Sequence, residues 1–431
     1  MSDPTPAEPA RQRLAFLFVF VTVMLDMLAV GIIIPVLPNL ILEFQGGSFA
    51  QAALLAGPLA ALWSLMQFLS SPVLGGISDR FGRRAVILYS NLGIALAYVV
   101  TALAPNLWIL ALGRIISGVS AASQSTAQAY IADTSPPEKR AARYGMLGAA
   151  FATGFVLGPA LGGLVSAHFG LRAAFWLAAG MSAVNFCYGL FVLPESLPKD
   201  RRRPFQIKQA NPLASLRFLG NNPGLRGLSI THFFFFLAQV ALPSTFVLYA
   251  GYRFGWRSDQ VGGVLALVGA AAIVVQAGLV RIVVPKLGER RALLAGLLAA
   301  ATAFAIYGTA AIGPLIFIGV AFGAFSGLYS PSAQALMTSQ IDATEQGRLQ
   351  GALSAVASMA GLIGPILFTQ LFAFFISDLA PAHIPGAAFY MASLLMLAAA
   401  CIAWRAMRRT PAPNAPAGGI AAPEAIETAR P

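Results

Sequence analysis

The sequence predicts an all-α integral membrane protein whose twelve transmembrane helices form two six-helix bundles. Of its 431 residues, 58% are hydrophobic and only 10% are charged, and the mean hydropathy is +0.74. A soluble domain of this size does not need so much apolar surface, whereas a chain that crosses a bilayer many times does. The apolar residues also fall into uncharged runs of about 20 residues, the length at which a helix crosses the hydrocarbon core.

Twelve such runs follow one another along the chain. The first follows a polar, Pro-rich N-terminus and lacks a small-residue cleavage site, so we expect a transmembrane helix there and not a signal peptide. The two cysteines, Cys187 and Cys401, lie inside apolar runs, which argues against a disulfide framework or a metal site. The spans are expected near residues 14–37, 51–73, 86–104, 107–131, 144–167, 173–193, 226–250, 261–284, 292–311, 314–338, 349–375 and 386–404.

The basic residues orient these spans. An even number of spans puts both termini on one side, and that side then holds all but four of the 28 Lys and Arg residues. Because cytoplasmic loops carry an excess of Lys and Arg, we expect both termini in the cytoplasm of a multi-pass inner-membrane protein. The net charge of +12 therefore reflects orientation in the membrane and does not indicate nucleic-acid binding. The four exceptions are Arg114, Arg172, Arg253 and Arg257.

The two halves of the chain repeat each other. Gly288 follows Gly82 by 206 residues, each in a basic loop, and Gly364 follows Gly158 by the same offset. A duplicated six-span unit explains the shared offset, and such repeats place a substrate site near the bilayer midplane, where the halves meet. The expected organisation is a cytoplasmic N-terminus at 1–13, bundles at 14–193 and 226–404, a solvated basic cytoplasmic linker at 194–225 and a disordered cytoplasmic tail at 405–431.

A charged island, GGISDRFGRR, connects the second and third spans. The order Gly-x-x-x-Asp-Arg-x-Gly-Arg-Arg is much narrower than a generic basic loop. Its Asp79 can bond backbone N–H groups at a helix end or pair with nearby arginines, and such contacts would exist in only one packing of the halves. We therefore expect a conformational switch formed by Gly75, Asp79, Arg80, Gly82, Arg83 and Arg84.

Asp26 is the only acidic residue deep within a predicted span, and Arg114 is the only such base. A carboxylate at bilayer depth costs a few kcal/mol, so Asp26 should face a polar cavity or a partner, where it can exchange a proton or pair with a cationic substrate group.

Arg114 lies about 10 Å from the outer end of its span, within reach of the headgroups. Polar residues further along span 4, including Gln124, favour a cavity-lining helix instead. Gln276, in the middle of span 8, is a further candidate for substrate binding.

Span 5 carries the segment GFVLGPALGG. Its Gly-x-x-x-Gly spacing lets helices approach closely, and its proline removes one helical hydrogen bond and tends to kink the helix. From the residues alone, this segment is a packing or hinge element. Its members are Gly154, Gly158, Pro159, Gly162 and Gly163.

Several segments together resemble the major facilitator superfamily and, within it, the drug–proton antiporters of the tetracycline resistance protein family. The resemblance implies the two-bundle transporter fold, export from the cytoplasm and exchange with inward-moving protons. It also implies that Asp26 is the family's span 1 aspartate, Asp79 its switch aspartate, Arg114 its span 4 arginine and Gln276 a span 8 glutamine. Residues 154–163 resemble the antiporter motif, which packs span 5 against the opposite half. The segments are LDMLAVGIIIPVLPNL (25–40), GGISDRFGRR (75–84), LGRIISGVS (112–120), IADTS (131–135), GFVLGPALGG (154–163), RFGWRSDQVG (253–262), EQGRLQG (345–351) and GLIGPILFT (361–369).

Two departures from the family pattern concern acidic residues. Tetracycline exporters of the best-known type carry further aspartates in spans 3 and 9, where this chain has Ala97 and Ala300. A site for a magnesium–tetracycline cation, or a proton path through several carboxylates, would lack those groups here. We expect no resident cofactor or metal and expect the proton as coupling ion. Whether the substrate enters as a metal complex is left open.

These features predict a proton-coupled secondary transporter, not an enzyme, that exports amphiphilic drugs by alternating access. The resemblance implies tetracycline-like substrates. The alternatives are an exporter of another hydrophobic drug or metabolite, and a non-transporting receptor or scaffold, which would show no transport that depends on Asp26. ATP is not expected to drive export, because the chain has no Gly-x-x-x-x-Gly-Lys loop. The expected partners are the bilayer, the drug and protons, with no nucleic acid and no obligatory protein partner.

The topology can be tested with single cysteines introduced at Gly46 and at Gln206 in a chain whose Cys187 and Cys401 are replaced by alanine. An impermeant thiol reagent applied to intact cells should label the cysteine at position 46 and not the one at position 206, because only the first would lie outside. Both should react once the membranes are opened, which controls for reactivity. Labelling of position 206 alone in intact cells would overturn the orientation.

Overall fold

The computed structural model describes residues 7–121, 123–135, 137–198, 200, 202, 219–220, 222–342 and 345–409, and within these ranges it contains helices and no strand. The helices of the first half are α1 (Ala7–Ile33), α2 (Leu37–Phe44), α3 (Phe49–Phe81), α4 (Arg83–Leu103), α5 (Leu107–Val119), α6 (Ser123–Thr134), α7 (Pro137–Phe169) and α8 (Leu171–Val192). Those of the second half are α10 (Pro223–Gln239), α11 (Ala241–Phe254), α12 (Ser258–Val274), α13 (Val280–Leu287), α14 (Glu289–Thr309), α15 (Leu315–Ala324), α16 (Tyr329–Thr338), α17 (Gln346–Phe375) and α18 (Ala387–Arg409).

These helices form the expected twelve membrane crossings. Eleven stretches are each long and apolar enough to span a bilayer. The remaining crossing is α5 followed by α6, because the 13 residues of α5 are too short to span alone. Several helices extend past the predicted spans: α1 begins at Ala7, and α18 continues through Arg409 into the segment expected to be a disordered tail. The rest of that tail, and residues 203–218 of the expected linker, lie outside the described residues.

Interruptions recur at matching positions in the two halves, as the repeat predicts. Gly82, with φ of 107°, joins α3 to α4, and Gly288, with φ of 77°, joins α13 to α14. Residues with a side chain are strained at such positive φ values, so glycine is needed at both turns. Pro159 inside α7 and Pro365 inside α17 are separated by the same 206 residues. One six-span plan therefore underlies both bundles.

Helix α7 packs against α1 through its glycines. A Cβ atom added at Gly154, Gly158 or Gly162 would overlap atoms of α1. Side chains at these positions would force the two helices apart, so the Gly-x-x-x-Gly spacing sets their distance. This contact holds the first bundle together around its first span.

The opposite side of α7 packs against the second bundle, as the resemblance to the antiporter motif implied. A Cβ at Gly163 would overlap the backbone of Ser258 at the start of α12, and a Cβ at Gly262 would overlap the carbonyl of Pro159. Helices α3 and α17 form the second large contact between the bundles, and α11 adds smaller contacts with α2 and α3. One chain segment, 154–163, therefore shapes both a bundle core and the interface between bundles.

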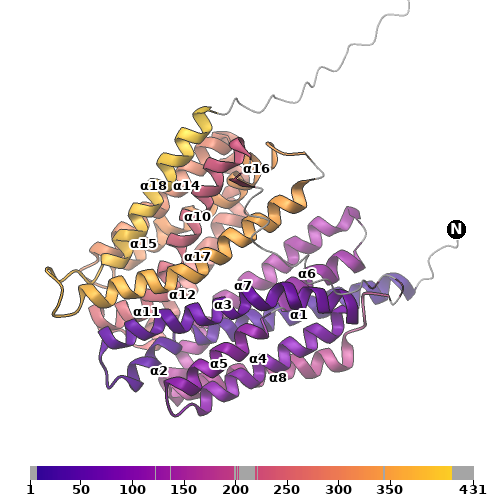
Figure 1. Ribbon diagram of the computed structural model, residues 1–431, viewed down its shortest axis with the longest axis horizontal. Helices are drawn as coiled ribbons and strands as arrows, with labels where there is room; N and C mark the ends of the chain where they lie inside the picture. Colours follow the sequence, from indigo (N-terminus) through magenta and orange to yellow (C-terminus); the bar gives the residue numbers. More distant parts are fainter. Residues whose placement is uncertain are drawn as a thin grey trace, which may run out of the picture.

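The bundles meet at one end and spread apart at the other (Figure 1). We call the end where α1 begins and α18 finishes the terminal end, and the opposite end the distal end. The hydrogen bonds that join the bundles within the described chain all lie in the distal part, and none lies at the terminal end. The described hydrogen bonds between the bundles are therefore concentrated at the distal end, and the bundles diverge towards the terminal end. The bonds are Asn39 Nδ2 to Ser258 Oγ (2.9 Å), Gln370 Nε2 to the Leu54 carbonyl (3.0 Å) and Arg257 Nη2 to the Ala167 carbonyl (3.4 Å).

The distal contact can be tested by cross-linking in a chain whose two native cysteines are replaced. The side chain of Thr369 lies where a Cβ of Gly57 would be. Cysteines at these two positions should therefore form a disulfide under mild oxidation and block transport, because the bundles could no longer separate there. The link is detected by cleaving the central linker and running a non-reducing gel.

Cysteines at Val73 and Ser354, which lie on α3 and α17 about equally far from this contact towards the terminal end, provide the matched control and should not join. Equal cross-linking of the control pair would show that the resting molecule is closed at its terminal end instead.

Candidate functional site

Asp26 lies in the interior of the first bundle and is only 4% exposed. Asn185 of α8, which is fully buried, donates from Nδ2 to Asp26 Oδ1 at 2.8 Å and to the Thr22 carbonyl at 3.1 Å. A hydrogen bond to an ionised carboxylate is shorter and stronger than one between neutral groups. The Asn185 amide therefore stabilises the charged form of Asp26 and ties α1 to α8 at this depth.

Arg114 of α5 is also buried, at 8% exposure, so its guanidinium does not snorkel to the headgroups. Tyr98 of α4 interacts electrostatically with both Arg114 and Asp26, which places the two deep charges in one region of the first bundle. Among the described residues, no hydrogen-bond partner reaches Nε or Nη2 of Arg114. Buried donors without a partner cost free energy, so these two groups are available to water or to a ligand acceptor.

Two asparagines lie at a common depth between α4 and α8. Leu88 of α4 meets Gly189 of α8, so Asn91 and Asn185, each one turn from that contact, lie at similar depth. Asn91 is fully buried, and within the described chain neither its amide nitrogen nor its oxygen has a partner; the same holds for Asn185 Oδ1. Such groups need water or the polar atoms of a ligand. We call the following residues the N-bundle polar cluster: Asp26, Asn91, Tyr98, Arg114 and Asn185.

The two positions where the family pattern has aspartates are closed by packing. Ala97 and Ala300 are 0% and 2% exposed. The Ala97 carbonyl accepts a hydrogen bond from Thr101 Oγ1 at 2.8 Å, and Gly113 of α5 packs against the same turn. The described residues contain no group of three His, Cys, Asp or Glu that could hold a metal ion. One carboxylate does not fit a resident hard cation, which takes several oxygen ligands.

Gln276 does not join the N-bundle polar cluster. It lies in the π-helical turn Val275–Leu279 between α12 and α13. Gly262 and Gly269 of α12 contact α7, and Gln276 continues the same seven-residue spacing. It is nevertheless exposed, so α7 no longer covers α12 at this position. Gln124 lies among the residues whose side chains are outside the described part of the chain.

The predicted switch loop is a single residue, Gly82, because α3 and α4 together include the rest of it. Gly75 lies within α3 with open space beside it. Arg80, in the last turn of α3, places its guanidinium carbon 5.0 Å from the ring centre of the next residue. Arg84 donates from Nη2 to a backbone carbonyl of α8 at 2.7 Å. The switch residues therefore belong to two rigid helix ends and not to a mobile loop.

Arg83 is at the centre of the residues predicted to form the switch. Its Nη1 lies 2.6 Å from Asp79 Oδ1 and donates to Ser78 Oγ at 2.9 Å, while its Nε lies 3.0 Å from Asp133 Oδ2. The Arg83 side chain is only 12% exposed, whereas that of Asp79 is 49% exposed. Arg83 thus links α3, α4 and α6, and Asp79 remains accessible to other partners.

Glu195, which follows α8, caps the start of α4. Its Oε1 accepts from the backbone N–H of Arg83 at 2.8 Å and from those of Ser196 and Leu197 at 3.0 and 3.1 Å. A carboxylate at a helix N-terminus satisfies unpaired N–H groups and interacts favourably with the helix dipole. A Cβ on Gly82 would overlap Glu195, so the glycine also permits this close approach.

Sequence reasoning missed five residues of these two sites. Asp133 and Glu195 fall near span ends, where a charge carries no burial cost and therefore no signal. Asn91, Tyr98 and Asn185 are uncharged and lie inside spans. A signal did exist for Asn185, because an amide in the middle of an apolar span is costly unless it is paired.

The fold agrees with a comparison to known families. The model of the Major Facilitator Superfamily matches residues 19–313 and 283–428. The chain belongs to this superfamily, and it is therefore a multi-pass membrane transporter and not an enzyme.

Within the superfamily, the chain resembles the tetracycline resistance proteins, which confirms the resemblance drawn from its motifs. It is 36% identical to the class C protein of Escherichia coli over 88% of this chain and 95% of that protein. It is also 36% identical to the class G protein of Vibrio anguillarum over 81% of this chain and 88% of that protein. For the class B protein of Escherichia coli, the identity is 35% over 82% of this chain and 87% of that protein.

Solved structures show the same fold. The human organic anion transporter MFSD10 is 26% identical, with a TM-score of 0.68 over 93% of this chain and all of that one. A bacterial homologue of the human lysosomal transporter Spinster, solved inward-facing and unoccupied, has a TM-score of 0.75 at 18% identity, over 95% of this chain and all of that one. Both cover essentially the whole two-bundle architecture.

Replacing Asp79 tests the switch. Asp79→Asn removes the charge that holds Arg83, a half-exposed pair that contributes on the order of 1 kcal/mol. That is about a five-fold change in an equilibrium between two conformations. We expect transport to fall while expression and substrate binding stay largely intact, measured by uptake into vesicles and by equilibrium binding to purified protein.

Glu289→Gln, at the matching turn of the second half, is the control and should transport normally. Equal loss of binding and transport by Asp79→Asn would point to misfolding or to a role in the substrate site.

Proposed function

We propose that the protein is a proton-coupled exporter of amphiphilic drugs that works by alternating access in the inner membrane, with both termini in the cytoplasm. The observation that carries this proposal is the buried carboxylate of Asp26, bonded to Asn185 and close to Tyr98. A carboxylate at this depth is expensive, and such residues mark ion and proton pathways in membrane transporters.

The divergence of the two bundles at the terminal end supports export from the cytoplasm. The basic residues gather at that end, and the positive-inside rule assigns it to the cytoplasm. A drug inside the cell would then enter the space between the bundles from that end, while the distal contacts close the other. Three relatives are named tetracycline resistance proteins, so tetracycline-like amphiphiles are the first substrate class proposed.

Competition at one carboxylate supplies the coupling. Among the described residues, Asp26 is the only acidic residue in the interior of a span. A proton and a cationic group of the substrate cannot both occupy that carboxylate, so release of one accompanies binding of the other. The proton is the coupling ion, and the proposal includes no resident cofactor. A substrate that arrives as a metal complex would bring its own ion and meet a single acidic ligand.

Organic anions form a second candidate substrate class, within the alternative of another drug or metabolite. The buried Arg114 keeps two donor nitrogens without a partner in the described chain, and a guanidinium binds carboxylates well. The structurally similar MFSD10 is named an organic anion transporter. An anion on Arg114 would leave Asp26 to the proton, so proton and substrate would then bind at separate groups.

Replacing Asp26 tests the coupling. Asp26→Asn keeps the size of the side chain but cannot ionise, so proton-driven uptake of tetracycline into inverted vesicles should be abolished. Asp26→Glu keeps a titrating group and should retain part of the activity with a shifted pH optimum. Glu43→Gln, which neutralises an exposed carboxylate at the distal end of the same span, should leave uptake unchanged.

Full proton-coupled uptake by Asp26→Asn would contradict the proposal and place the coupling group elsewhere. Running the same assay with a fluorescent organic anion separates the two substrate classes. Arg114→Gln should abolish uptake of an anion while sparing binding of a cationic drug.

A further inference from the structure

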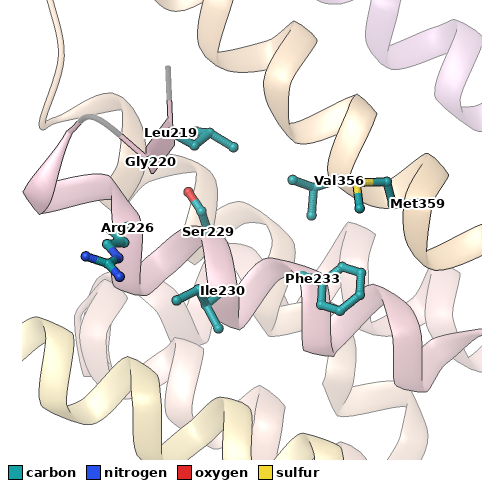
Figure 2. Close-up of a pocket in the computed structure, with 8 residues that line it drawn as sticks. All are labelled: Leu219, Gly220, Arg226, Ser229, Ile230, Phe233, Val356 and Met359. Atoms are coloured by element: carbon teal, nitrogen blue, oxygen red, sulfur yellow. The ribbon is translucent and has the colours of Figure 1, made fainter. Parts of the chain in front are cut away.

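A groove runs between α10 and α17 near the terminal end and has a volume of about 370 Å³ (Figure 2). Its walls are mainly apolar, with one cation and one hydroxyl. We call it the α10–α17 groove. Its lining residues are Leu219, Gly220, Arg226, Ser229, Ile230, Phe233, Val356 and Met359.

Ser229 is the polar group inside this groove. It is 8% exposed, and its Oγ has no hydrogen-bond partner among the described residues. Many helical hydroxyls of this chain bond back to their own helix, as Thr231 does to the Gly227 carbonyl and Ser244 to the Val240 carbonyl, whereas Ser229 and six other buried hydroxyls find no partner among the described residues. Figure 2 shows the Ser229 oxygen pointing away from α10 towards Leu219. A buried hydroxyl in this state needs an acceptor or donor from water or from a bound molecule.

The groove opens towards lipid and not towards the space between the bundles. Met359 precedes Ile366 by seven residues and shares its side of α17, where large apolar side chains are exposed. The other exposed side of α17 carries small and polar residues such as Ser354 and Ser358. An apolar exposed face is suited to hydrocarbon, and Ile230, at 41% exposure, continues that face on α10.

Arg226 places a positive charge at headgroup depth. It lies four residues after the N-cap of α10, Asn222, or about 6 Å along the helix axis. The side chain is exposed and forms no ion pair with a described residue. Basic side chains between helices on the cytoplasmic side bind anionic headgroups. An anionic headgroup at this depth would therefore meet an exposed cation that pairs with no described carboxylate.

We propose that the α10–α17 groove binds an anionic phospholipid of the surrounding bilayer. Arg226 holds the headgroup phosphate, and the Ser229 hydroxyl donates to a phosphate or ester oxygen. Ile230, Phe233 and Met359 contact the first part of one acyl chain. These groups follow the order of groups along a phospholipid. The charge lies at the membrane surface, the buried hydroxyl lies behind it, and the apolar rim comes last. This site is separate from the N-bundle polar cluster and from the coupling at Asp26.

Lipid titration of the purified full chain in neutral detergent tests this inference. Dioleoylphosphatidylglycerol should raise the melting temperature and stay bound in native mass spectrometry, whereas dioleoylphosphatidylcholine should do so weakly. Arg226→Gln should lower the apparent affinity for phosphatidylglycerol about five-fold, because one basic residue near the surface contributes on the order of that factor. Ser229→Ala should lower it about two- to ten-fold, the contribution of one hydrogen bond.

Arg281→Gln is the matched control, because Arg281 is an exposed cation of the same bundle that does not line the groove. It should bind phosphatidylglycerol like the unchanged chain. Melting in phosphatidylcholine checks that each variant is folded. Equal affinity for the two lipids, or equal effects of Arg226→Gln and Arg281→Gln, would overturn the site.

Competitive displacement of phosphatidylglycerol by tetracycline would overturn it too, since the groove would then be a drug site. None of these measurements depends on transport. A failure of the lipid site is therefore distinguishable from a failure of the coupling at Asp26.

Discussion

The close approach of α7 to α1 and to α12 is the contact on which the rest of the structure depends. In a bilayer, lipid tails are as apolar as leucine, so helices associate through close packing between small residues and not through the hydrophobic effect. Gly154, Gly158 and Gly162 supply that packing towards α1, and Gly163 supplies it towards α12. Because this contact lies in the distal part of the interface, the bundles can diverge at the terminal end. The same segment thus builds one bundle and joins it to the other.

The duplicated plan carries chemistry in only one bundle. Each member of the N-bundle polar cluster has a counterpart 206 residues later in the second bundle. The counterpart of Asp26 is His232, whose Nδ1 lies 3.3 Å from the hydroxyl of Tyr329. The other four counterparts are apolar, so the second bundle has an aromatic and aliphatic core in place of a buried ion site. They are Leu297, Phe304, Val320 and Met391. Under the proposed coupling at Asp26, this asymmetry leaves proton handling to the first bundle and apolar surface to the second.

Much of the architecture could be predicted from the sequence because the bilayer imposes severe constraints on it. Every span must be long, apolar and helical, since backbone groups find no partners in lipid, so the twelve spans are visible as uncharged runs. The same cost makes Asp26 and Arg114 recognisable in the sequence, because a charge inside such a run is rare without a function. The repeat was readable from glycines such as Gly82 and Gly288, since positive φ leaves little choice of residue there. Residues near span ends pay no such cost, which is why Asp133 and Glu195 gave no signal.

The sequence by itself determined the helices, their order, their orientation bias and the identity of the two buried charges. Only the tertiary structure decided which side chains meet. It brought Asn185 into hydrogen-bonding contact with Asp26 and kept Gln276 apart from both. It also reduced the expected switch loop to a single glycine between two helix ends. The physical reason is that helix formation depends on neighbours in the chain, whereas a contact between spans depends on helix rotation and crossing. Those are set by packing across many residues at once, and α7 shows how a few glycines can decide them.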